Sequence, residues 1–364
     1  MVFVGTVTTI KSSLCGLSLD DLTAELAALN EKPYRAKQIL EWIFVKRVTS
    51  IDEMTNLPTG LRETLKERYV VSHSEVVTIQ GAKDQTQKFL YKLADGRFVE
   101  SVLIPASPGL YGERSDRRTI CVSSQVGCAY ACKFCASGLA GFTRNLDAGE
   151  IVSQLLATEA GTGEKINNIV FMGMGEPLAN FKNLTKAIEI INSHWGMNIG
   201  ARHFTVSTSG LAPVIKKLAD IPIQIRLAIS LHGATDEVRN KIMPVNEKWN
   251  LEQLFDALRY WRSRKKQKIT FEFILIEGVN DSLDQAAALA KLTKELDAKV
   301  NLIPYNTVEG LEWKRPSNRR CEAFKKVLMD AGVLATLRLE KGHDIDAACG
   351  QLRLREEKDQ GIIS

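Results

Sequence analysis

The hydrophobic positions divide the chain into an amino-terminal part with helical periodicity and a longer part in which strands and helices alternate. In the first part, apolar residues recur at helical spacing in three stretches, which begin after Ser18, after Pro33 and around Leu57. Ser18 is a suitable cap for the first of them. The pattern predicts a small module of three helices.

Short β-type runs follow between Glu75 and Leu103. They read EVVTIQ, KFLYKL and RFVESVLI, and Ala94-Asp95-Gly96 separates the last two. A short polar turn containing glycine between two such runs predicts a β-hairpin. The stretch from Pro105 to Arg118 predicts a loop.

From Arg118 onward, apolar and β-branched runs alternate with segments of helical periodicity. The six runs are TICVSSQ, NIVFMGM, HFTVSTS, IRLAISL, ITFEFILI and KVNLIPY. Six such units predict an α/β fold with a parallel sheet, an open or partial (β/α)6 barrel. A seventh run, LATLRLE, leads into the tail. We therefore expect an accessory module at 1–105, a barrel at 106–345 and a tail at 346–364.

Composition narrows the class of protein. The chain has 364 residues, of which 45% are hydrophobic and 25% charged, as in globular proteins that do not span a membrane. With no long apolar run and no secretory signal, we expect a cytoplasmic monomer without a membrane partner. A net charge of +5 permits a polyanionic partner but does not identify one. Seven cysteines in a reducing compartment are ligands, catalysts or buried fillers rather than a disulfide framework.

The strongest chemical signal is a cysteine triplet directly after the first barrel strand. Cys128, Cys132 and Cys135 lie in the sequence CAYACKFC. Three thiolates at this spacing can hold three irons of a [4Fe–4S] cluster and leave the fourth iron open to a ligand. A structural zinc site is the alternative, but it needs a fourth ligand, and no nearby Cys or His supplies one.

Polar residues follow the later barrel strands, and barrel enzymes build their active sites at that end. The second strand ends in GMGEP, where Glu176 offers a carboxylate to an ammonium group. Ser207, Ser230-Leu231-His232 and Asn306 follow the third, fourth and sixth strands. Each alone is more often a turn or a structural group, but their shared position favours a site.

The cysteine triplet, with an aromatic residue before its last cysteine, resembles the radical S-adenosylmethionine (SAM) superfamily. This resemblance implies a radical SAM barrel, one [4Fe–4S] cluster and a SAM molecule chelated by the open iron. It also implies reductive cleavage of SAM to a 5′-deoxyadenosyl radical, with a reductant such as flavodoxin or ferredoxin.

Further segments are similar to the RlmN/Cfr family of RNA adenine methyltransferases, over nearly the whole chain. They are CVSSQVGCAYACKFC, GMGEP, VSTSG, AISLH, NLIPYN and DIDAACGQL. The resemblance implies that Cys349 carries the methyl group, that Cys121 is the second essential cysteine and that Glu100 accepts a proton. Its implied SAM-contacting residues are Gly175, Glu176, Ser207, Ser230, Leu231, His232 and Asn306.

The implied reaction consumes two SAM molecules, because the C2 and C8 carbons of adenine are too weakly nucleophilic for direct methyl transfer. One SAM methylates Cys349, and the second gives the radical that abstracts hydrogen from that thiomethyl group. The methylene radical adds to the ring, Glu100 removes the ring proton, and Cys121 attacks the Cys349 sulfur. A transient disulfide then releases the methylated base.

Structural alternatives exist for several of these residues. Cys121 lies within a strand, where cysteine is commonly a small buried hydrophobe, and Glu100 beside Arg97 fits a surface ion pair. Cys349 follows the last strand in a segment typical of a mobile, reactive thiol. Basic residues at 259–268 and at 314–320 suit RNA, although such runs are more often solvated helix faces. Cys15 and Cys321 match no catalytic position.

The DIDAAC tail favours the housekeeping branch, so we expect C2 methylation of an adenine in 23S rRNA and also in tRNA. Cfr-like C8 methylation is the alternative, as is a radical SAM enzyme with a non-RNA substrate. A zinc-stabilised RNA-binding protein is a further rival. The loop 105–118 is longer than is typical of the family, and Lys341 and His343 lie where an Arg-Gly pair is more usual.

Overall fold

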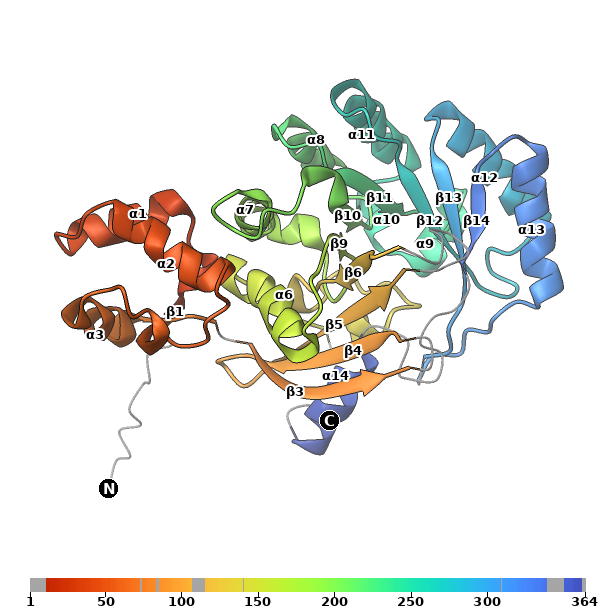
Figure 1. Cartoon of the computed structure of the whole chain (residues 1–364). Helices are drawn as coiled ribbons and strands as arrows, with labels where there is room; N and C mark the ends of the chain where they lie inside the picture. The colour runs from red at the N-terminus through yellow and green to blue at the C-terminus, as the bar shows by residue number, and fades with distance from the viewer. Residues whose placement is uncertain are drawn as a thin grey trace.

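A computed structural model describes residues 11–361, except 73, 83–84, 107–114, 140, 309 and 339–349. The amino-terminal module contains three helices, which confirms the sequence pattern (Figure 1). They are α1 (Leu19–Ala28), α2 (Tyr34–Phe44) and α3 (Thr59–Arg68). Ser18 caps α1 and accepts a hydrogen bond from the Asp21 N–H, as expected. Two short strands, β1 (Ser12–Ser13) and β2 (Tyr69–Val70), pair at the base of the module.

A sheet of ten strands forms the body, in the order β14-β13-β12-β11-β10-β9-β6-β5-β4-β3. Its parallel strands are β6 (Arg118–Cys121), β9 (Asn168–Phe171), β10 (Phe204–Thr208), β11 (Arg226–Ser230), β12 (Thr270–Leu275), β13 (Lys299–Pro304) and β14 (Ala335–Leu337). Three antiparallel strands extend it, namely β3 (Glu75–Gly81), β4 (Gln87–Lys92) and β5 (Phe98–Pro105). The six βα units, the seventh strand and the hairpin at Ala94-Asp95-Gly96 are thus confirmed. Since β3 and β14 end the strand order, the barrel is partial.

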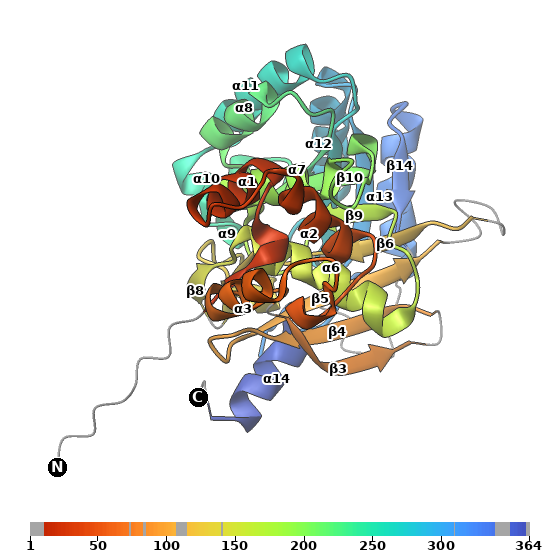
Figure 2. The same cartoon turned by 60° about the vertical axis from the view of Figure 1, so that its left-hand side comes forward.

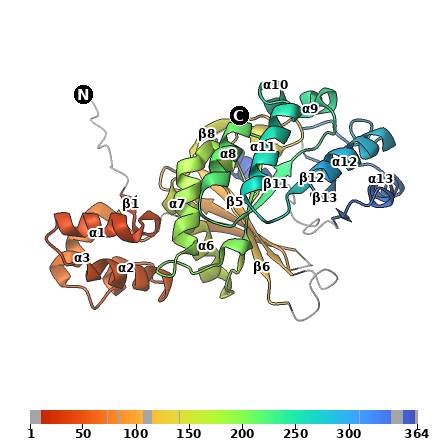
Figure 3. The ribbon, with the colours of Figure 1, turned by 90° about the horizontal axis from the view of Figure 1, so that it is seen from above.

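Helices follow one another along the outer side of the sheet (Figure 3). The helices between and after the parallel strands are α6 (Ala148–Thr162), α7 (Phe181–Asn192), α8 (Ala212–Asp220), α9 (Asp236–Ile242), α10 (Val245–Lys248), α11 (Leu251–Arg264), α12 (Leu283–Glu295) and α13 (Asn318–Asp330). The last helix, α14 (Gln351–Asp359), lies instead against the antiparallel strands and contacts β5 (Figure 1, Figure 2).

The first predicted barrel strand, TICVSSQ, is divided in the structure. After β6 ends at Cys121, β7 (Gln125–Gly127) leaves the main sheet and pairs with β8 (Phe142–Asn145). The N–H groups of Ser124 and Gln125 both donate to the Met174 carbonyl, which turns the chain toward the second strand's end. The β7–β8 pair closes the base of the loop that carries the three cysteines.

The helical module packs against the barrel through α6. A Cβ atom on Gly16 would lie 2.6 Å from the Gly149 backbone nitrogen, so both positions need the small residue. Cys15 is fully buried beside them, and burial raises the pKa of its thiol to about 11. Cys321 is also fully buried, in α13. Both are structural cysteines, in line with their lack of a match to catalytic positions.

The sheet runs without interruption through β5 and β6, which pair antiparallel from Val102 to Pro105. The expected division at 105/106 therefore falls inside one sheet, and it stays a prediction about function rather than packing. The first residues of the tail, 346–349, lie outside the described residues. Most of the 105–118 loop also lies outside them.

Candidate active site

A cavity of about 330 Å³ opens at the carboxyl ends of the parallel strands. Eight of the predicted site residues line it: Cys128, Cys132, Cys135, Gly175, Glu176, Ser207, Ser230 and His232. Their other lining partners include Tyr130, Phe134, Ser137, Ser209, Glu272 and Arg338. The chain therefore brings together the cysteine triplet and the polar residues of three different strands.

The three cysteines lie on the loop between β7 and β8, where backbone hydrogen bonds fix the chain. The Cys128 N–H donates to the Gly141 carbonyl, and the Cys135 N–H donates to that of Cys132. Burial raises the pKa of Cys128 to about 11 and also raises that of Cys132, with the neighbouring thiols adding to the effect. The thiolates therefore need a nearby positive charge, which a bound metal cluster provides.

The donor set fits a cluster better than a single ion. Among the described residues, no group of three or more His, Cys, Asp or Glu side chains converges as ligands of one metal ion. A mononuclear zinc site requires such convergence, whereas a [4Fe–4S] cluster takes one thiolate on each of three irons.

Glu176 is 3% exposed at the end of the second strand, and three donors hold its carboxylate. The Leu178 N–H donates to Oε1 at 3.0 Å, and the Ser209 N–H and hydroxyl donate to Oε2 at 2.7 and 2.8 Å. Burial raises the pKa of Glu176, and these hydrogen bonds oppose that shift. Gly175, with φ +97°, allows the turn, since a Cβ there would lie 2.5 Å from Gln125.

His232 lies in the left-handed region, with φ +56°, and is 5% exposed. The Ile274 N–H donates to its Nδ1 at 3.0 Å, so the neutral ring carries its proton on Nε2. Burial lowers the pKa of His232 to about 3. Phe134, one residue before Cys135, packs edge to face against the His232 ring, with 4.8 Å between the ring centroids. The histidine is a fixed, neutral donor beside the cysteine loop.

The serines of β10 and β11 face each other, with 3.5 Å between the Oγ atoms of Ser207 and Ser230. Two predicted SAM-contacting residues are not part of the cavity wall. Leu231 is fully buried and offers its backbone N–H to the Glu272 carbonyl, while Asn306 is half-buried beyond β13. Their proposed contacts stay predictions.

Glu100 lies in β5 and is 2% exposed, so it is not part of a surface ion pair. Its Oε2 accepts from Lys88 Nζ at 3.2 Å and from the Gly350 N–H at 2.9 Å, and its Oε1 accepts from the Arg353 N–H at 2.6 Å. Gly350 directly follows Cys349 in the chain. Cys349 itself, like Lys341 and His343, lies outside the described residues.

Sheet register relates Cys121 to Glu100. Cys121 is opposite Val102 in the β5–β6 pair, and Val102 is two residues from Glu100, so all three side chains share one face. Gly350 approaches the cysteine loop as well, because a Cβ on it would lie 3.0 Å from Ser137 Oγ. Ser137 follows Cys135 by two residues.

Three functional neighbours carried no sequence signal. Lys88 and Glu272 lie in strands, and Glu272 Oε1 accepts a hydrogen bond from Asn301. Arg239 is fully buried and donates to the carbonyls of Ser209 and Leu231. It therefore fixes two strand ends, the one that carries Ser209, which binds Glu176, and the one that precedes His232. An isolated charged residue in an amphipathic pattern gives no indication of burial.

The basic segment 259–268 is largely engaged within the protein. Arg259 pairs with Asp256 and Glu295, Arg264 with Asp220, and Lys268 with Asp297. This helix therefore has little uncompensated charge for RNA, as the solvated-face interpretation expected.

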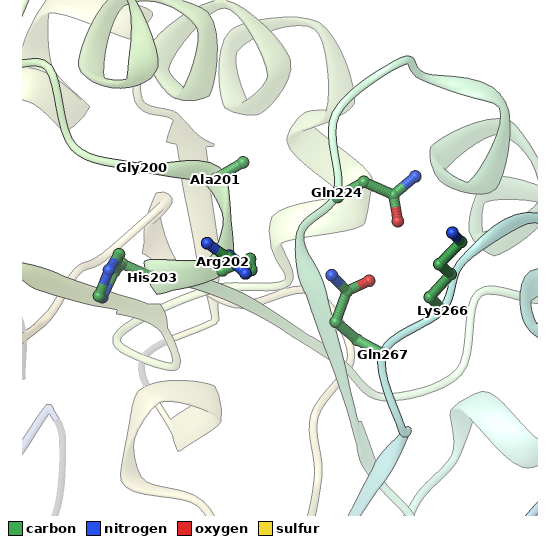
Figure 4. Close-up of a pocket in the computed structure, with 7 residues that line it drawn as sticks. All are labelled: Gly200, Ala201, Arg202, His203, Gln224, Lys266 and Gln267. Atoms are coloured by element: carbon green, nitrogen blue, oxygen red, sulfur yellow. The ribbon is translucent and has the colours of Figure 1, made fainter.

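A separate pocket of about 550 Å³ lies at the opposite, amino ends of β10 to β12 (Figure 4). Its walls are Gly200, Ala201, Arg202, His203, Gln224, Lys266 and Gln267. None of these is a predicted site residue.

Comparison with known proteins decides the family. Residues 122–290 match the sequence model of the radical SAM superfamily, and residues 12–71 match that of a ribosomal RNA large subunit methyltransferase N-terminal domain. The chain is 56% identical over 341 residues to a probable dual-specificity RNA methyltransferase RlmN of Akkermansia muciniphila, covering 94% of this chain and 95% of the relative. The chain belongs to the RlmN family.

A second relative from the RlmN family and a crystal structure are also similar to the chain over most of its length. A probable dual-specificity RNA methyltransferase RlmN of Staphylococcus saprophyticus is 45% identical, over 96% of this chain and 94% of its own. A radical SAM methyltransferase from Sphaerobacter thermophilus superposes with a TM-score of 0.87 at 41% identity, covering 93% of this chain and 98% of that one. The expected radical SAM fold and its cofactors, a [4Fe–4S] cluster and SAM, are thus confirmed. In the described part of the chain, no helix has the length and apolarity of a membrane span.

Proposed function

We propose that this RlmN-family chain methylates C2 of an adenine in 23S rRNA, and in tRNA, through a methylated Cys349. One observation carries the proposal. Glu100, on the same sheet face as Cys121, accepts a hydrogen bond from Gly350, the residue bonded to Cys349. Gly350 in turn packs on Ser137 beside the cysteine triplet. The proposed base, resolving thiol and methyl carrier therefore belong to segments that meet at one site.

Cys128, Cys132 and Cys135 would hold the cluster, which leaves one iron open for SAM. When bound there, the cluster and SAM supply a 5′-deoxyadenosyl radical. Glu176, held by three donors at the cavity wall, keeps acceptor capacity for the SAM ammonium group. The Ser207 and Ser230 hydroxyls and the His232 Nε2–H offer polar contacts at the same wall.

Proton removal and release belong to the second group of residues. Glu100 would accept the ring proton, while the adduct radical would give up its unpaired electron to the one-electron acceptor that an oxidised cluster supplies, so that the C–H electron pair restores the aromatic ring. The Cys121 thiolate would then attack the Cys349 sulfur, and the S–CH2 electron pair would leave with the carbon, which takes up a proton to become the methyl group. None of the described cysteines is in a disulfide, and Cys349 lies outside the described residues. In this scheme the disulfide between Cys121 and Cys349 is a transient species.

The choice of C2 over C8 rests on the relatives, which carry the RlmN name rather than the Cfr name at 45% to 56% identity. Their name, dual-specificity RNA methyltransferase, supports both rRNA and tRNA as substrates. An RNA substrate and a flavodoxin or ferredoxin reductant would place the monomeric enzyme in the cytoplasm.

Two cysteine variants test the reaction scheme. Cys349→Ala lacks the sulfur that accepts the first methyl group, so it should bind SAM and RNA yet give neither methylated protein nor methylated RNA. Cys121→Ala should still attach RNA to Cys349 but fail to break that bond. It should accumulate a covalent RNA adduct, seen as a nuclease-sensitive band on a denaturing gel. Normal turnover by Cys121→Ala, or an adduct formed without Cys349, would overturn the scheme.

A further inference from the structure

A buried ion pair supports the proposed base. The side chains of Lys88 and Glu100 are 1% and 2% exposed, and Lys88 Nζ lies 3.2 Å from Glu100 Oε2. Lys88 is opposite Val102 in the β4–β5 pair, two residues from Glu100, so both side chains share one face. Burying a charge pair is costly, and an apolar pair would fill the same space at no such cost. A structural role alone gives no reason for the charges.

The same carboxylate binds the start of α14. Gly350 is the N-cap residue of this helix and has no side chain with which to cap it. Glu100 takes that role from β5, because it accepts hydrogen bonds from the N–H groups of Gly350 and Arg353. A negative charge there also interacts favourably with the positive end of the helix.

The rest of α14 also packs against the body of the protein. Leu352 forms a cluster with Leu90 and Phe98, and Leu354 packs against the main core. Within the helix, Arg353 and Glu357 form a buried ion pair. The Glu100 carboxylate is the attachment at the start of the helix, where it binds the N–H groups of Gly350 and Arg353. Among the described residues, Oε2 contacts Lys88 Nζ and the Gly350 N–H, and Oε1 accepts from the Arg353 N–H.

We propose that Lys88 is a positioning residue for Glu100, and that their ion pair docks the start of α14, so that the base is in place only while the segment that follows Cys349 is docked. This inference rests on the proposed function for the role of Glu100. The dock itself depends only on contacts within the chain. Lys88 touches neither SAM nor RNA in this account, and it acts through Glu100.

The test uses cluster-loaded, full-length protein with Lys88→Met and Lys88→Arg. Lys92→Met is the matched control, since Lys92 lies in the same strand on the same face but is exposed. Hydrogen exchange of the peptide 350–357, measured without SAM or RNA, reports the dock directly. We expect exchange about tenfold faster in Lys88→Met, unchanged exchange in β5 and β6, and recovery in Lys88→Arg.

The second readout separates steps of the reaction. Lys88→Met should methylate Cys349 and attach RNA, but release it about tenfold more slowly, so that the covalent adduct accumulates. Lys88→Arg should restore release, and Lys92→Met should behave like the unsubstituted chain. Unchanged exchange in Lys88→Met would overturn the dock. Parallel loss of Cys349 methylation and turnover, with no adduct, would overturn the positioning role. If the unsubstituted chain methylates no RNA, the proposed function fails, while the exchange result still decides the dock.

Discussion

Buried ionisable side chains are concentrated around the site, and each has a defined electrostatic state. Glu176, His232 and Glu272 are all at most 5% exposed. Burial raises the pKa of Glu176 and of Glu272 and lowers that of His232. These groups therefore make folding stability depend on pH as well as shaping the cavity.

His232 gives a pH prediction with a definite sign. Its pKa falls from the ordinary value of about 6.5 to about 3 in the folded chain, so the folded state resists protonation. Its contribution to stability is complete above pH 6.5 and is lost as the pH falls from there toward 3. His232→Asn, which tolerates the left-handed backbone, lacks this dependence. Between pH 7.5 and 5.5, urea unfolding should show the unsubstituted chain losing about 1 kcal/mol more than the variant. Parallel pH curves would contradict the buried, neutral histidine.

Glu176 gives a binding prediction. Glu176→Gln keeps the shape of the turn but removes the charge proposed to pair with the SAM ammonium group. A hydrogen bond to a charged group contributes about 1.5–3 kcal/mol, so SAM affinity should fall by about 10- to 100-fold. Cluster absorbance should not change. Equilibrium dialysis measures the affinity, with exposed Glu237→Gln as the control. Equal SAM binding by both variants would show that Glu176 serves only the turn.

At the scale of elements, periodicity was enough to place the parallel strands but not the two pieces of structure that complete the site. The division of TICVSSQ into β6 and β7 depends on hydrogen bonds to Met174, about fifty residues away along the chain. The docking of α14 depends on Lys88 and Glu100, from strands more than 240 residues before it. Local pattern carries no information on such long-range contacts.

The start of α14 can be perturbed directly at Gly350, which has φ +95° and lies against Ser137. Gly350→Ala should strain the backbone, press on the cysteine loop and loosen α14, at a cost of about 1–3 kcal/mol. Limited proteolysis should then cleave α14 faster, and turnover should fall. Gly361→Ala is the control, because Gly361 also has a positive φ but nothing within 4 Å of an added Cβ. Equal effects of the two changes would indicate backbone strain alone.

At the scale of the whole molecule, the chain combines a barrel, an antiparallel extension and a helical module that packs on α6. Sequence motifs gave the cysteine triplet and Glu176, because the chemistry of a cluster loop and of a strand-end turn is local. Lys88, Arg239 and Glu272 could not be found in this way, since only folding shows that they are buried. The methyl carrier Cys349 is still a prediction from resemblance, which Gly350 supports as its neighbour.

We propose that this protein as a whole places a methyl group on C2 of adenine by way of Cys349. The most direct measurement is mass analysis of nucleosides from 23S rRNA fragments and tRNA, incubated anaerobically with cluster-loaded protein, SAM and a reductant. We expect 2-methyladenosine with the unsubstituted chain and no methyladenosine with Cys349→Ala. Formation of 8-methyladenosine, or of 2-methyladenosine by Cys349→Ala, would contradict it.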